Sequence, residues 1–141
     1  MTMERAFFTL LKSVPGIDIG GLTSPRIYAQ RAPDNAQAPF VIFQRINTFP
    51  YRSINNPSGL ARAEIQVDVY GATYYDAKER AEKIQNALDG FRGEMAQDGM
   101  SPPVYTKFGG IILQNALETL DETDEPVLHR VTMTFSVTYH Y

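Results

Sequence analysis

The stretch 60-LARAEIQVDVYG-71 alternates between small or branched apolar residues and polar or charged ones. Successive side chains of a β-strand point to opposite faces of a sheet, so this alternation predicts a strand with one buried and one polar face. The predicted buried face consists of Ala61, Ala63, Ile65, Val67 and Val69. We expect the rest of the sheet to form around this strand.

A helix is predicted directly after this strand, over residues 73–88. Thr73 and Asp76 have the spacing of a capping box, in which the threonine hydroxyl accepts a hydrogen bond from the backbone of the first turn. Gly90 stands where a left-handed residue commonly ends a helix. Apolar residues at helical spacing predict one buried stripe, formed by Ala77, Ala81, Ile84, Leu88 and Phe91.

The same two patterns place the remaining elements. An amphipathic helix is predicted over residues 3–14, and Pro15-Gly16 ends it. Further strands are predicted over residues 25–29, 40–47, 109–120 and 127–141. The order α-β-β-β-α-β-β predicts a single α+β domain over residues 1–141. We expect a mostly antiparallel sheet of four to five strands, with two helices packed on one face and the last two strands forming a hairpin.

Composition excludes several classes of protein. The 141 residues include no cysteine, which rules out disulfides, cysteine-ligated metals and thiol nucleophiles. The net charge is −3 and the basic residues are scattered, which argues against DNA binding as the main function. The apolar run near the N-terminus is too short for a signal sequence or a membrane span, so we expect a protein made and folded in the cytoplasm.

Residues that could carry catalysis or bind a metal do not form a known pattern. His129 and His140 lack the spacing of a metal-binding pair. The acidic stretch 121–125 lacks the central glycine and the distal glutamate of a calcium loop. No serine stands in a G-x-S-x-G turn, and the glycine pairs lack the context of a phosphate loop. The sequence therefore predicts no catalytic residue, metal or cofactor.

Residues 48–59, with prolines and asparagines, and residues 92–108, with glycines and prolines, are predicted to be loops. Both carry more apolar and aromatic residues than ordinary loops. Tyrosine and arginine are enriched at protein interfaces, and long loops are often functional. We therefore expect contacts to neighbouring subunits or partners through Phe49, Tyr51, Arg52, Ile54, Met95, Met100 and Tyr105. The alternatives are that the first segment folds back on the domain and that the second is merely mobile.

Four segments together resemble a known family of virion proteins. They are 62-RAEIQVDVYGATYYDAK-78 followed by 88-LDGF-91, then 38-APFVIFQR-45, 129-HRVTMTFSVTY-139 and 26-RIY-28. With these segments in their order along the sequence, the chain resembles the tail-completion (tail-terminator) family of siphophages, prophages and gene transfer agents. The N-terminal helix and residues 92–108 match no part of the family pattern.

The resemblance implies a structural protein of the virion, made in the bacterial host and placed at the head-proximal end of the tail. Such proteins form a homo-hexameric ring that caps the tail tube, stops its polymerisation and presents a surface to the head-side connector or stopper protein. DNA passes through the ring as cargo only, and neither a membrane nor catalytic residues are involved.

Two alternatives stay open. One is another head–tail connector, such as a head-closure protein, or a tube-like subunit. The other is a small α+β enzyme or ligand-binding domain with a pocket at the sheet edge, lined by His129, Asp68 or Glu118.

Overall fold

The computed structural model describes residues 2–15, 17, 26–33, 36–52, 57–121 and 127–140. Its two helices are α1 (Thr2–Lys12) and α2 (Tyr74–Leu88). Its strands are β1 (Ile27–Ala29), β2 (Phe40–Arg52), β3 (Pro57–Gly71), β4 (Gly93–Ala96), β5 (Tyr105–Asp121) and β6 (Leu128–His140). The predicted α+β class and both predicted helices are confirmed.

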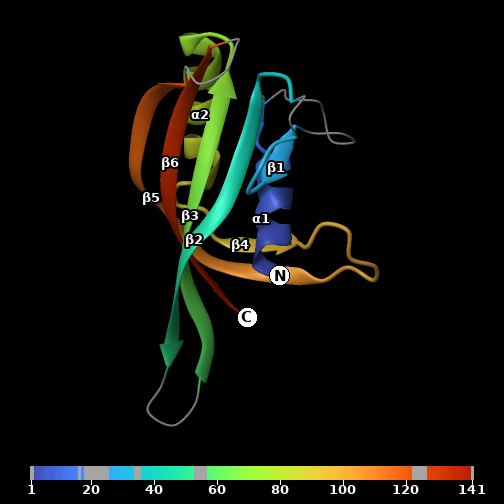
Figure 1. Ribbon diagram of the computed structural model, residues 1–141. Coiled ribbons are helices and arrows are strands. Elements are labelled where there is room, and N and C mark those ends of the chain that lie inside the picture. Colours follow the sequence, from blue (N-terminus) through green and yellow to red (C-terminus); the bar gives the residue numbers. More distant parts are fainter. Residues whose placement is uncertain are drawn as a thin grey trace.

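All the described strands belong to one sheet of order β1-β2-β3-β6-β5-β4 (Figure 1). The strand β1 pairs with β2 in parallel, whereas the other neighbours are antiparallel. The prediction of a mostly antiparallel sheet of four to five strands was therefore wrong, because the sheet is mixed and has six strands. The predicted hairpin of the last two strands is confirmed by the β5–β6 register.

The segment 48–59 is not the loop that its prolines and asparagines predicted. Instead, β2 continues to Arg52 and β3 begins at Pro57, and both extend beyond the rest of the sheet (Figure 1). Register shifts between Arg45 and Asn47 and between Tyr51 and Arg52 interrupt the pairing. Prolines are tolerated at a strand start and near bulges, which is why the pattern misled the prediction. We call this extension, residues 46–52 and 57–60, the β2–β3 arm.

The segment 92–108 is also more regular than predicted. The short strand β4 pairs with the beginning of β5. These two strands and the chain between them, residues 97–104, extend sideways past α1 (Figure 1). The strand β4 has only four residues, including a glycine and a glutamate, so its sequence does not show the apolar–polar alternation typical of a strand. Only its pairing with β5 identifies it as a strand. We call residues 93–108 the β4–β5 arm.

The predicted start and end of α2 are confirmed. The Thr73 hydroxyl accepts a hydrogen bond from the Asp76 backbone at 3.2 Å, and Gly90 has a φ of +85°. The four helical residues of the predicted stripe are buried, and Phe91, just beyond the helix, packs partly buried against the core.

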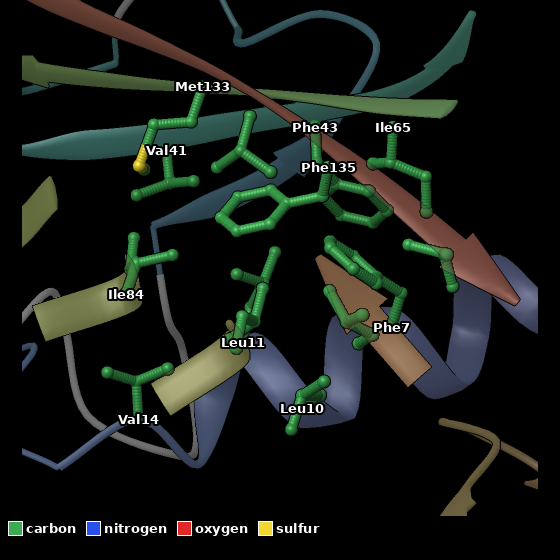
Figure 2. Close-up of a cluster of buried hydrophobic side chains, with 14 of the residues drawn as sticks. Phe7, Leu10, Leu11, Val14, Val41, Phe43, Ile65, Ile84, Met133 and Phe135 are labelled. Carbon is green, nitrogen blue, oxygen red and sulfur yellow. The ribbon is translucent and has the colours of Figure 1, made fainter. Parts of the chain in front are cut away.

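The core lies between the two helices and one face of the sheet, which we call the inner face. Figure 2 shows Phe135 and Met133 of β6 above Leu11 of α1 and Ile84 of α2. The side chains of Phe7 and Phe135 are fully buried. The opposite, outer face of the strands carries mostly polar residues, and neither α1 nor α2 packs on it.

Candidate assembly surfaces

Of the residues suggested for an enzyme pocket, Glu118 and His129 both contact Tyr74, whereas Asp68 lies on the outer face of the sheet. Asp68 on β3 accepts a hydrogen bond from Thr132, whereas Glu118 on β5 accepts one from Tyr74 of α2. The His129 ring lies at the start of β6, edge-on to the Tyr74 ring. Within the described part of the chain, no group of three or more acidic or histidine side chains could hold a metal ion.

The β2–β3 arm exposes two of its apolar side chains. Phe49 is 39% exposed and Ile46 is 44% exposed. The Arg62 guanidinium lies 4.6 Å from the centre of the Phe49 ring, on the directly opposite strand. Such a contact holds the phenylalanine in one position while leaving part of it free. The predicted contact residues Tyr51 and Arg52 belong to β2, but their side chains, like Ile54, lie outside the described part of the structure.

The β4–β5 arm exposes Met100 and Tyr105, whereas Met95 packs against the core. Asp98 fastens the arm to α1 through both its backbone and its side chain. Its carbonyl accepts a hydrogen bond from Arg5 Nη1 at 2.7 Å, and its carboxylate forms an ion pair with Lys12 at 2.8 Å. The arm is thus held in place, while its end presents apolar surface to solvent.

One edge of the sheet is open along β2. The strand β1 covers β2 only from Val41 to Phe43. Gln30 then takes a positive φ of 66° and its backbone N–H donates to the Phe43 carbonyl, after which the chain leaves the sheet. Among the described residues, no strand pairs with this side of β2 over residues 44–52. We call this segment the β2 edge.

A hollow adjoins the β2 edge on the inner face. It has a volume of about 230 Å3 and is lined by Glu4, Arg5, Phe8, Ala29, Phe43 and Asp98. A second hollow of about 170 Å3 shares Glu4, Ala29 and Phe43 with it and continues along Gln44 and Arg45. We call both together the edge hollow. Sequence reasoning missed it because helix, β1 and β2 form it only when they pack together.

The opposite edge of the sheet is open along part of β5. The segment after α2 covers the strand near Ile111, whose carbonyl accepts from Gly90 at 2.6 Å. The Leu113 N–H donates to the Asp89 side chain at 3.0 Å. Beyond it, no described strand pairs with this side of residues 114–121, which we call the β5 edge. Leu117 and Leu120 on this segment are 62% and 48% exposed.

Polar contacts tie the β5 edge to the start of α2. The Glu118 carboxylate accepts a hydrogen bond from Tyr74 at 2.9 Å and pairs with the Lys78 ammonium. The hydrogen bonds from Lys78 and Tyr74 lower the pKa of Glu118, and the bond to Glu118 raises the pKa of both Tyr74 and Lys78. Glu118 therefore stays charged and locally neutralised at neutral pH.

The outer face of the sheet carries a buried charge that is fully paired. Asp68 is only 5% exposed. It accepts hydrogen bonds from Thr132 at 2.7 Å, Gln66 at 3.0 Å and Arg130 at 3.2 Å. The Arg130 guanidinium also lies 5.7 Å from the centre of the Tyr70 ring. This network holds the Arg130 guanidinium beside Asp68 on the outer face.

Replacing Asp68 with alanine should lower the free energy of unfolding by about 1–3 kcal/mol, because its donors lose their common acceptor. The loss of unfolding free energy is partly offset, because Arg130 is one-third exposed and its guanidinium then hydrogen-bonds to water. Urea unfolding followed by circular dichroism measures the change. Thr134→Ala on the same face is the control, with an expected change within about 0.5 kcal/mol. Equal stability of Asp68→Ala and the unchanged protein would contradict the proposed role of the network.

Open sheet edges, projecting arms and exposed apolar side chains are the features of a subunit that assembles with other proteins. The family model for tail completion protein gp17 matches residues 5–140, and the chain belongs to this family. It is therefore a structural protein of the phage tail and a component of the virion. The resemblance seen in the sequence is confirmed.

Solved structures show the same fold. A chain of the virion of a native gene transfer agent particle superposes with a TM-score of 0.68 and 14% sequence identity. The match covers 99% of this chain and 96% of that chain. No curated protein matches the sequence. In the described residues, no helix is both long enough and apolar enough to cross a membrane.

Proposed function

We propose that the protein is a tail terminator. Six copies form a ring that caps the completed tail tube, stops further tube subunits from adding, and presents a surface to the head-side connector or stopper protein. DNA passes through the ring as cargo. The protein acts through these contacts and carries out no turnover. Membership of the tail completion family and the shared virion fold support this proposal.

The proposal of a ring rests mainly on the two open edges, which lie on opposite sides of one sheet. A cyclic ring uses two different patches on every subunit, joined head to tail. The β2 edge and the β5 edge are two such patches, and an open strand edge readily pairs with another chain. In the sheet order, β5 runs antiparallel to β2. Rotation about a ring axis to which the strands are tilted keeps these directions, so the β5 edge of one copy meets the next β2 edge in a staggered, antiparallel orientation.

The β2–β3 arm contributes its free β2 edge to the ring interface, whereas the apolar side chains on both arms supply contacts outside that interface. Both project from the body and present apolar side chains, with Phe49 and Ile46 on one arm and Met100 and Tyr105 on the other. Exposed aromatic and methionine side chains at the centre of a contact contribute much of its binding energy. We assign these exposed apolar side chains to contacts with the tube protein and the head-side connector.

The outer face of the sheet suits the passage of DNA. Its β6 residues Thr132, Thr134, Ser136 and Thr138 are uncharged, and the charge of Arg130 is balanced by Asp68. Non-specific DNA binding depends on unneutralised lysine and arginine side chains. A channel bordered by the β6 part of this face would not retain DNA.

The oligomeric state tests this proposal. Size-exclusion chromatography with light scattering should show a species near six subunits at high concentration or in the presence of the tube protein. A double substitution that charges the β5 edge, Leu117→Asp with Leu120→Asp, should yield a folded monomer. The same change at Met100, on an arm, should leave the ring intact. A strict monomer under all conditions would contradict the proposal.

A further inference from the structure

We infer that the edge hollow is completed by a leucine of the neighbouring copy, Leu120 on its β5 edge. The inference rests on the proposed ring and names one side chain and its receiving site. The hollow is then a socket between subunits, and each subunit supplies the socket on one side and the leucine on the other.

The hollow has the volume and the apolar lining to take one aliphatic side chain. Its volume of about 230 Å3 exceeds that of a single leucine, and Phe8, Ala29 and Phe43 supply its apolar surface. The Phe43 ring is held by the rings of Phe7 and Phe8, with centres 5.7 and 6.3 Å away. The apolar surface of the hollow is therefore held in one conformation before a partner binds, which lowers the entropy cost of binding.

The polar groups around the hollow also fit an incoming strand. Glu4 and Arg45 form an ion pair at 2.6 Å, so no unbalanced charge faces the hollow from these residues. The second carboxylate oxygen of Glu4, Oε2, is buried and accepts no hydrogen bond within the described part of the protein.

The side chain that enters is determined by the alternation of β5. Residues directly opposite each other on paired strands lie on the same face. Glu118 stands opposite Val131 and Leu120 opposite His129, on the face of the buried core. Leu117 stands opposite Thr132 and so lies on the outer face. When β5 extends the neighbouring sheet, Leu120 lies on the same side as Phe43 and α1.

The position along the strand points to the same residue. The β2 edge begins at Gln44, where β1 ends. In antiparallel pairing, the last residues of the β5 edge lie beside the first residues of the β2 edge. Leu120 then lies beside Arg45 and diagonally from Phe43, and these two residues line the edge hollow. The pairing is staggered, as it is wherever strands tilt around a ring axis.

Engineered cysteines test the inference directly, because the natural chain contains none. Ala29→Cys lines the hollow, and Leu120→Cys in the same chain can reach it only from the next copy. Mild oxidation with diamide should link the subunits into a ladder of up to six on a non-reducing gel. The matched control combines Ala29→Cys with Leu117→Cys on the same strand but the outer face. That control should remain mostly unlinked, because disulfides need Cα atoms within about 7 Å.

A second measurement does not depend on linking. Leu120→Ala should weaken ring assembly about 10- to 100-fold, whereas Leu117→Ala should weaken it less, because only Leu120 becomes buried in the hollow. Rings that form without preferential linking through Leu120, or that tolerate Leu120→Ala as well as Leu117→Ala, would overturn the inference and leave the ring proposal standing. Absence of any oligomer in either variant and in the unchanged protein would overturn both.

Discussion

Replacing Phe135 with alanine should lower the free energy of unfolding by about 3–5 kcal/mol. Phe135 is fully buried in β6 at the centre of the cluster in Figure 2. Around it, Leu11 and Ile84 approach from the two helices and Ile65 from β3. Removal of its ring leaves a cavity that these side chains, held on separate elements, fill only in part. A domain of this size has about 5–15 kcal/mol of stability in total, so the effect is large.

Chemical denaturation measures this change, provided that the slope of the transition stays constant. Ile112→Ala on β5 is the matched control, because Ile112 is 63% exposed and should tolerate the change within about 0.5 kcal/mol. A loss below about 1 kcal/mol for Phe135→Ala would show that the helices do not pack on β6 as described.

Replacing Gly71 with alanine should destabilise the fold by about 1–3 kcal/mol through steric overlap. Gly71 ends β3 immediately before α2. A Cβ at this position would lie 2.6 Å from the backbone nitrogen of Ala77 and 3.1 Å from its Cα. Because the obstacle is backbone, α2 must move away from the sheet. The contact explains why a glycine stands where the strand passes into the helix.

Gly110→Ala provides the control for this substitution, because its added Cβ would meet nothing within 4 Å and its backbone needs no positive φ. The melting temperature of the Gly71 variant should fall by several degrees while that of the Gly110 variant changes little. Equal melting temperatures would mean that α2 lies farther from β3 than described.

Local sequence patterns predicted those helices and strands whose formation depends only on residues close to each other in the sequence. The alternation in β3 and the capped, striped helix α2 depend on neighbouring residues only. The prediction failed for segments that are strands only because a neighbouring strand pairs with them. Thr48 to Arg52 are extended because β3 lies beside them, and β4 is a strand because β5 offers it a partner.

The sequence indicated which types of residue would be exposed for contacts better than it indicated which individual residues would be. Phe49, Met100 and Tyr105 are exposed on arms, as their composition suggested, while Met95 packs against the core. Their partners remain proposals. The open edges and the edge hollow were not predictable, because Phe8, Ala29 and Phe43 meet only through the parallel pairing of β1 with β2. In the sequence, Leu120 does not differ from other strand residues. Only the structure shows that no described strand pairs with its edge of β5.

Electron microscopy of particles assembled with and without this protein tests its role as a tail terminator most directly. We predict that its loss yields overlong or headless tails, and that supplying the protein restores tails of uniform length joined to heads. Filled heads that leak DNA beside tails of normal length would contradict the account and indicate a head-closure protein instead.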